Sequence, residues 1–577
     1  MTAVDWMCLA GYLAILIAIG TLQKKKAAGG VEDYFVSGRR LPWYLAGTSM
    51  IAASFASDTP LLVSGLVRSR GIWGNWQWWG FATSTLLAVF FFARLWRRTG
   101  VVTDVELTEL RYSGKSAATL RGFKAVYWGV LFNCFATGAW SLVGMTKVLG
   151  AMTGIDSRTA ILLSAVLGGA YAIVSGLWGI VATDAFQFVM AVGGAVTVAI
   201  LAVHAAGGMG AVLAASAMPP SRLDILPTGD SGALAYCLPF LLIQWWAWKN
   251  TDGSGVLIQR MNACKNESEA VKATLWYSIG HYALRTWPWI IAGLATLVLV
   301  PNSALPIVNG MPDPEAAYPI LLRTVVPAGL RGLILAWFFA EFMSAMAQAM
   351  NWGGSVLVTD LYKRFIRPAS LPAHDLRVAR LATLVIMAGA ILTAFLSPSI
   401  TKSFDFVLKA TSAIGVVYIL RWVWWRVNAW SEMSALVMGP LMTFWLTGKI
   451  LPALGYATDN PVAGILVTVG GGIFVVLIVT FLTSPDDETR LMEFYRRVRP
   501  PGPGWRRIAR LCPETKSDLP LGRIFALWIA GTAMVYSLMG GVGMTLLGRP
   551  GGWPLLAAGT MLLLLILRHL RNADSHP

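Results

Sequence analysis

About fifteen apolar segments long enough to cross a lipid bilayer occupy most of this 577-residue chain. Two of them are interrupted near the middle by polar and helix-breaking residues. The stretch 54–60 reads Ser-Phe-Ala-Ser-Asp-Thr-Pro inside 41–67, and 249–255 reads Lys-Asn-Thr-Asp-Gly-Ser-Gly inside 234–261. In a bilayer every backbone N–H and C=O needs a partner, so such stretches survive only where they line a cavity or are buried in protein. The chain is therefore predicted to be an all-α polytopic membrane protein.

The composition agrees with this class, because 56% of the residues are hydrophobic and only 13% are charged. Most Lys and Arg residues lie in loops that follow odd-numbered segments, beginning with Lys24, Lys25 and Lys26. Basic loops stay on the cytoplasmic side, so we expect an N-terminus outside and a cytoplasmic C-terminus. The net charge of +17 then reflects topology, and no nucleic-acid partner is predicted.

The positions of the apolar segments divide the chain into two consecutive blocks of five spans, with additions at both ends. The predicted spans, numbered one to fifteen, are 3–22, 41–67, 73–95, 122–150, 158–175, 178–206, 234–261, 270–300, 330–361, 377–397, 403–425, 430–450, 462–483, 522–547 and 552–570. Interrupted spans two and seven each open a block of five, and consecutive blocks with an odd number of spans run in opposite senses, as an inverted repeat requires. The predicted parts are 1–40 (peripheral helix and loop), 41–207 and 208–429 (the two repeats), 430–483 (peripheral helices), 484–521 (a basic cytoplasmic loop) and 522–577 (a C-terminal helix pair).

Interrupted helices at matching positions of two halves are typical of the binding site of a secondary transporter. Charges inside the membrane are costly and mark functional candidates. Asp58 and Asp252 lie in the interruptions, whereas Arg285 and Lys409 lie inside spans eight and eleven. The two cations could bind an anionic or hydroxyl-rich solute, neutralise the buried carboxylates, or extend to the membrane surface. The residues leave these alternatives open.

One face of span nine carries polar residues at steps of three and four. These residues are Glu341, Ser344, Gln348, Asn351 and Ser355. They could form hydrogen bonds between helices, or they could supply oxygens to a hard cation such as Na⁺. Asp184 lies about six residues into span six, too deep for a helix cap, which favours a buried ionic role.

Several motifs in order resemble the sodium:solute symporter family, which includes sodium/glucose, sodium/proline and sodium/sialic acid carriers. They are 33–43 (Asp-Tyr-Phe-Val-Ser-Gly-Arg-Arg-Leu-Pro-Trp), 47–53, 176–187, 259–260 (Gln-Arg) and 358–362 (Val-Thr-Asp-Leu-Tyr). The resemblance implies a LeuT-like five-plus-five inverted repeat with extra peripheral helices. It also implies Na⁺-coupled symport of a small polar solute, such as a sugar, amino acid or organic acid, across a bacterial inner membrane by alternating access.

The resemblance also implies site residues. The Na⁺ ligands carried over are Ala52 and Phe55 through their carbonyls, with Glu341, Ser344 and Ala345, and a second site at Asp184 and Gln348. Family members usually have a small residue at the Glu341 position and a hydroxyl at the Ala345 position. A carboxylate at 341 could strengthen Na⁺ binding or carry a proton, so a proton-coupled or uncoupled carrier is the alternative. The substrate contacts implied are Ser54, Thr59, Gln77 and Arg285.

Two other classes of protein compete with a carrier. A sensor could signal through 484–521 and the last two helices, while a membrane enzyme is disfavoured because no nucleophile–base or metal-ligand set is visible. We expect 484–521, with arginines such as Arg496, Arg497 and Arg499, to contact anionic membrane lipids. No organic cofactor and no obligate protein partner are predicted.

Overall fold

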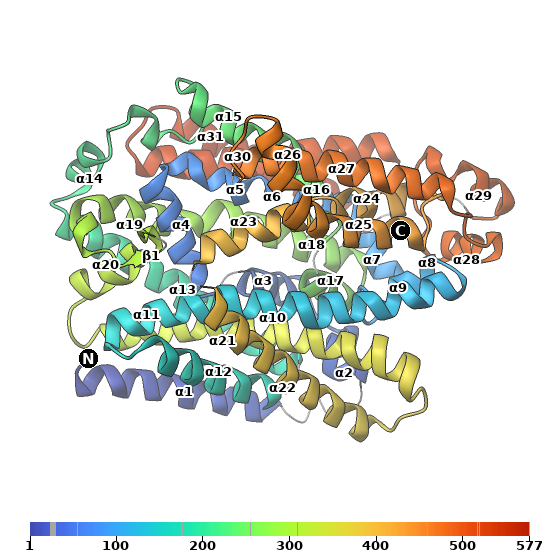
Figure 1. Ribbon diagram of the computed structural model, residues 1–577, viewed down its shortest axis with the longest axis horizontal. Coiled ribbons are helices and arrows are strands. Elements are labelled where there is room, and N and C mark those ends of the chain that lie inside the picture. The colour runs from blue at the N-terminus through green and yellow to red at the C-terminus, as the bar shows by residue number, and fades with distance from the viewer. Residues whose placement is uncertain are drawn as a thin grey trace.

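The computed structural model describes residues 1–23, 31–54, 56–174, 177–253, 255–308, 310–397, 399–458, 460–515, 517–518 and 520–575. Most long helices run side by side along the longest axis of the molecule (Figure 1). In the labels used below, η marks 3-10 and π-helical segments.

The first part of the chain contains α1 (Ala3–Gln23), α2 (Val31–Val36), η1 (Ser37–Arg39), α3 (Trp43–Ala53), α4 (Asp58–Ser69), η2 (Ile72–Asn75), α5 (Trp76–Trp79), α6 (Phe81–Leu87), η3 (Ala88–Phe92), α7 (Ala93–Thr99), α8 (Leu107–Arg111), α9 (Gly114–Val126), η4 (Tyr127–Phe132), α10 (Asn133–Ala136), η5 (Thr137–Leu142), α11 (Val143–Thr153), α12 (Ser157–Val174), α13 (Leu177–Ala205) and α14 (Met209–Ala215).

The middle part contains η6 (Pro220–Leu223), α15 (Ser231–Pro239), η7 (Phe240–Gln244), α16 (Trp245–Ala247), α17 (Gly255–Ala263), α18 (Glu267–Ser278), η8 (Ile279–Leu284), α19 (Thr286–Leu299), η9 (Asn302–Ala304), β1 (Ile307–Val308), β2 (Met311–Pro312), η10 (Pro314–Ala316), α20 (Ala317–Val325), α21 (Arg331–Val356), η11 (Leu357–Ile366) and α22 (Pro372–Leu396). Strands β1 and β2 pair antiparallel.

The last part contains α23 (Ile400–Ala410), α24 (Ile414–Val423), α25 (Ala429–Leu441), η12 (Met442–Leu446), α26 (Thr447–Ala453), α27 (Pro461–Leu482), α28 (Glu488–Val498), η13 (Pro503–Trp505), α29 (Arg506–Leu511), α30 (Leu521–Leu546) and α31 (Gly552–Ser575).

Both predicted interruptions are breaks in the helices. In span two, α3 and α4 meet at an angle of 60°, and in span seven the helix stops after α16 and resumes at α17. Hydroxyl groups donate hydrogen bonds to carbonyls at both breaks. Ser54 Oγ donates to Met50 O at 2.8 Å, and Thr251 Oγ1 donates to Trp248 O at 2.7 Å. The polar residues therefore stabilise the ends that they interrupt.

The two broken spans lie against each other. Leu41, just before α3, forms a parallel bridge with Cys264, which follows α17. Its N–H donates to Ala263 O at 3.0 Å, and its carbonyl accepts from Lys265 N at 3.1 Å. Trp96 Nε1 of α7 donates to the carbonyl of Asp252 at 2.8 Å, which connects the second break with α7.

In the described residues, nine helices are long and apolar enough to cross a membrane, or up to eleven if each bent pair counts as one span. The exact number of spans, about fifteen, stays a prediction, as do the boundaries of the repeats and flanking parts. A further break, which was not predicted from the sequence, lies in span eleven. There α23 and α24 meet at an angle of 44°. Prolines at 239, 440 and 452 lie inside further helices, where they remove a helical hydrogen bond.

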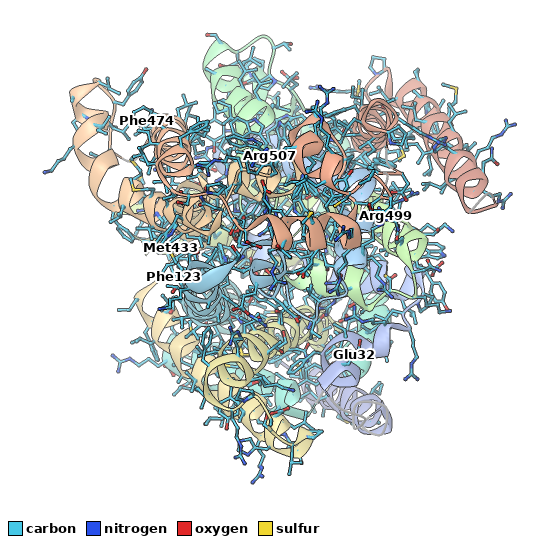
Figure 2. All side chains as sticks on the ribbon, turned by 90° about the vertical axis from the view of Figure 1, so that its right-hand side faces the viewer. Glu32, Phe123, Met433, Phe474, Arg499 and Arg507 are labelled. Carbon is cyan, nitrogen blue, oxygen red and sulfur yellow. The ribbon has the colours of Figure 1, made fainter. Side chains whose placement is uncertain are left out.

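The segment 484–521 folds onto one end of the helix bundle, at the right of Figure 1, and Figure 2 looks onto that end with Arg499 and Arg507 labelled. Several of its basic side chains bind acidic partners at the surface. The pairs are Arg490–Glu493 (3.0 Å), Arg496–Glu514 (2.8 Å) and Arg507–Glu488 (2.5 Å). Asp518 of the same segment binds the largely buried Arg98 of α7 (2.6 Å). The contact between this segment and anionic lipids stays a prediction. The acidic partners in these ion pairs would compete with lipid headgroups for the same arginines.

Trp505 anchors this segment. The indole is buried, its Nε1 donates to Trp422 O at 2.8 Å, and its ring lies 4.7 Å from the Arg111 guanidinium. We expect Trp505→Ala to destabilise the docked segment by about 3–5 kcal/mol, the usual loss for a buried tryptophan. Trypsin should then cleave within 484–521 several-fold faster than in the unmodified protein. Trp553→Ala, at a side chain 73% exposed, is the control, and equal cleavage rates in both variants would contradict the anchoring role.

Candidate functional site

A cavity of about 290 Å³ lies between the two broken spans, and both breaks contribute to its wall. From the first break come Ala53, Ser54, Ala56, Asp58 and Thr59; from the second come Trp248, Lys249, Asn250 and Gly253. The unwound backbone thus lines a pocket, as the bilayer argument requires of non-helical segments at this depth.

Aromatic side chains make up much of the remaining wall. They are Trp78, Phe81, Phe132, Trp140, Tyr277, Tyr282, Trp352 and Phe404. The rings of Phe81 and Trp248 lie close together, with centroids 3.8 Å apart at an interplanar angle of 30°. Such rings offer flat apolar surface to a ligand while their polar edges form hydrogen bonds. One of these bonds joins Tyr282 to Thr85, with 3.2 Å between the oxygens.

Four π-helical segments present residues to the cavity. Ala88 comes from η3, Phe132 from η4, Trp140 from η5 and His281 from η8. A π-helical segment inserts an extra residue into a helical turn and is frequent at functional sites. No local sequence motif indicates these segments. None of their residues that line the cavity was predicted from the sequence to be a site residue.

Three of the residues predicted to contact substrate line the cavity, and the other four do not. Ser54, Asp58 and Thr59 are in the wall. Gln77 instead donates a hydrogen bond to Asp405 on α23. Lys409, also on α23, lies beside Gly464 of α27. The structure therefore brings together the predicted residues of the first break only, and the substrate role of each stays a prediction.

Arg285 is buried behind the cavity. Its guanidinium donates to the carbonyl of Ile51 at 2.9 Å and to that of Ser54 at 3.2 Å, and it hydrogen-bonds Nδ1 of His281. Ile51 and Ser54 lie at the C-terminal end of α3, where the helix dipole favours a cation. Arg285 therefore caps the first half of the broken span and contacts the wall through His281.

Asp252 belongs to a buried ionic cluster near the docked segment. Its carboxylate accepts from Arg421 at 2.5 Å and from Trp422 Nε1 at 2.7 Å. Arg421 also contacts Glu432 at 3.2 Å, and Glu432 accepts from Lys124 at 2.6 Å. The cluster connects the second break with α24, α25 and α9. Arg421, Glu432 and Lys124 were not identified from the sequence, because their partners are distant along the chain.

The predicted ion residues Asp184, Ser344 and Gln348 form one buried network. Asp184 accepts from Ser49 Oγ at 2.5 Å, from Ser344 Oγ at 2.7 Å and from Gln348 Nε2 at 3.3 Å. Arg260 joins the network by donating to Gln348 Oε1 at 2.7 Å and to Ser49 Oγ at 3.2 Å. Ser344, expected at the first Na⁺ site, thus lies with the residues expected at the second. Ser49 and Arg260 were missed as site residues, although both fall in quoted motifs.

The remaining predicted ion ligands are separate from this network. Glu341 is buried, and both its carboxylate oxygens lack a hydrogen-bond partner among the described residues. Ala345 lines the cavity and Ala52 is buried near the end of α3. Phe55 lies outside the described residues. The structure does not test the ion-binding role of any of these residues.

Comparison with known proteins agrees with this architecture. A profile of the sodium:solute symporter family matches residues 34–439. The sodium/glucose cotransporter of Vibrio parahaemolyticus is 25% identical, covering 85% of this chain and 92% of that protein. Sodium/glucose cotransporter 4 of Mus musculus is 24% identical, covering 84% of this chain and 77% of that protein. The solved structure of a Na⁺-coupled sialic acid symporter in a substrate-bound outward-open state superimposes with a TM-score of 0.66 at 21% identity, covering 84% of this chain and 99% of that one.

The broken helices and the superposition define a multi-pass membrane protein with a LeuT-like fold, which confirms the predicted fold class. The profile match extends over most of the chain, and the chain belongs to the sodium:solute symporter family. It is a Na⁺-coupled symporter, as the resemblance predicted. The elements from η12 to α31 lie beyond the residues that the family profile matches.

Proposed function

We propose that this protein uses an inward Na⁺ gradient to take up a small polar organic solute that binds in the cavity between the two broken spans. The observation that carries the proposal is that both breaks line one cavity. A ligand held there contacts both inverted repeats, so its binding can favour one arrangement of the repeats over another. We propose that the protein lies in the cytoplasmic membrane with α28 and α29 on the inner side, because basic loops stay on the cytoplasmic side.

We propose the oxygens of Asp184, Ser344 and Ser49 as Na⁺ ligands. Each hydroxyl lies within hydrogen-bond distance of one oxygen of the Asp184 carboxylate, Ser49 Oγ of Oδ2 and Ser344 Oγ of Oδ1, and a hard cation prefers such oxygens. Na⁺ binding would replace the hydrogen bonds that the two hydroxyls now donate to Asp184. The carbonyl of Ala52, near the C-terminal end of α3, remains a second candidate ligand for Na⁺.

Uptake into proteoliposomes tests the proposed function. The full chain is reconstituted, and uptake of radiolabelled D-glucose, N-acetylneuraminate, L-proline, L-leucine and L-phenylalanine is measured with and without an inward Na⁺ gradient. We expect at least one solute to accumulate above equilibrium only when the gradient is present. Accumulation driven equally by a proton gradient in Na⁺-free buffer would overturn Na⁺ coupling and favour the carboxylate of Glu341 as a proton carrier.

Ser344→Ala should weaken the dependence of uptake on Na⁺. The substitution removes an oxygen that contacts a buried carboxylate, an interaction worth about 1.5–3 kcal/mol, so the Na⁺ concentration for half-maximal uptake should rise roughly tenfold or more. Ser355→Ala is a matched control on the same helix, since the Ser355 hydroxyl donates to its own helix at Trp352 O. Unchanged Na⁺ activation in Ser344→Ala would remove this residue from the site.

A further inference from the structure

Lys249 presents an ammonium group to the cavity from the second break. Its Nζ donates to Asn250 Oδ1 at 2.7 Å and lies 4.3 Å from the ring centroid of Phe132, with Trp248 at 5.5 Å and Trp128 at 5.6 Å. No carboxylate lies within ion-pair distance of this nitrogen among the described residues. Aromatic rings stabilise a cation and leave it free to bind an anion. Lys249 therefore provides a positive site with room for an anionic group.

Asp58 provides the opposite charge from the first break. It is the first residue of α4, where the helix dipole favours a carboxylate. Among the described residues no other side chain donates a hydrogen bond to this carboxylate. The neighbouring hydroxyls are engaged with backbone, Ser54 Oγ with Met50 O and Thr59 Oγ1 with Ala56 N. Asp58 therefore offers its charge to the cavity.

Within the cavity lining, Asp58 is the acidic residue and Lys249 is the lysine or arginine. His281 also lines the cavity, but its Nδ1 is bonded to Arg285. The rest of the cavity wall is mainly aromatic and aliphatic. A neutral solute would offer the two charges only uncharged hydrogen-bonding groups, which stabilise a buried charge less than an opposite charge does. A solute with one charge would leave the other charge unpaired.

We infer that the solute is a zwitterion with an apolar body, such as an amino acid with an aliphatic or aromatic side chain. Its carboxylate binds Lys249, its ammonium binds Asp58, and its apolar part packs against the aromatic wall. This assignment rests on the proposed function, because it identifies the solute class of the same cavity. Lys249 is then the residue that selects for a carboxylate.

Equilibrium binding to the purified full chain tests the assignment in Na⁺ buffer. The thermal midpoint is measured with each of the twenty standard L-amino acids, with D-glucose, and with fragments of leucine and phenylalanine that lack one charged group. The fragments are 3-methylbutan-1-amine, 4-methylpentanoate, 2-phenylethylamine and 3-phenylpropanoate. We expect at least one apolar amino acid to stabilise the protein and its fragments to bind roughly tenfold more weakly or worse, because each leaves one charge unpaired. Equal stabilisation by D-glucose or by a fragment, or none by any amino acid, would overturn the inference.

Two variants should change the preference in opposite directions. Lys249→Met should remove the need for a carboxylate, so the amine fragment should bind at least as well as the amino acid. Asp58→Asn should likewise favour the acid fragment. Lys115→Met, the same substitution at an exposed lysine, should leave the preference of the unmodified protein unchanged. An unaltered preference in a folded Lys249→Met variant would contradict the role of this residue.

The binding assay also separates failure of this inference from failure of the proposed function. Amino-acid binding without Na⁺-driven uptake would contradict symport but leave the zwitterion site intact. Na⁺-driven uptake of D-glucose, without amino-acid binding, would confirm symport and overturn the zwitterion assignment.

Discussion

Replacing Arg421 with Met should lower the free energy of unfolding by about 3–5 kcal/mol, the usual loss when one partner of a buried ion pair is removed. The guanidinium contacts Asp252 at 2.5 Å and Glu432 at 3.2 Å, and all three side chains are almost fully buried. Without it, two carboxylates share the cluster with Lys124 alone. The thermal midpoint of the purified protein should fall accordingly.

A functional consequence follows because Asp252 lies in the second break. Loss of Arg421 releases this unwound stretch from α24, so uptake should fall together with stability. Arg490→Met is the matched control, since Arg490 pairs with Glu493 at the surface, where such a bridge contributes about 0–1 kcal/mol. The double variant Arg421→Met/Asp252→Asn should recover part of the lost stability. No difference between Arg421→Met and Arg490→Met would refute the structural importance of the cluster.

Asp184→Asn should abolish the dependence of uptake on Na⁺ and destabilise the protein by about 3 kcal/mol. The carboxylate accepts from Ser49 and Ser344, and it is the negative charge that compensates Arg260 in this network. Neutralising it removes the proposed anionic Na⁺ ligand and leaves the buried guanidinium without a counter-charge. Na⁺ titrations of uptake and the thermal midpoint report the two effects separately.

A second substitution distinguishes an ion ligand from a structural partner. In Asp184→Asn/Arg260→Met both charges are absent, so stability should return toward that of the unmodified protein. If Asp184 binds Na⁺, the double variant remains insensitive to Na⁺. Recovery of Na⁺ activation in the double variant would show that Asp184 serves only to balance Arg260.

The breaks in spans two and seven could be predicted because helix-breaking and polar residues act locally. Pro60 and Gly253 each disfavour a continuous helix whatever their neighbours are, and the apolar residues on both sides require burial in lipid or protein. Candidate residues near the breaks followed from the same argument, and Ser54, Asp58 and Thr59 do line the cavity. Lys249 was visible in the second interruption, but nothing local indicated that its ammonium group faces that cavity.

Pairings between distant side chains could not be predicted in this way. Asp252 and Arg421 are 169 positions apart, and Gln77 and Asp405 are 328 apart. A charged residue such as Asp252, considered without its partner, is compatible with substrate binding, with a structural ion pair or with a place at the membrane surface. The π-helical segments raise the same difficulty, since the extra residue in each turn depends on packing against neighbouring helices.

The amino-acid sequence by itself determined that the chain crosses the membrane many times, where two of its helices break, and which family it resembles. These properties depend on hydropathy, backbone conformation and local motifs, which are written in consecutive residues. Only the tertiary structure decided which polar groups meet: Arg285 on the carbonyls at the end of α3, Arg260 in the Asp184 network and Lys249 beside the cavity. The physical reason is that a buried charge takes its role from the partner it meets, and packing between distant helices selects that partner.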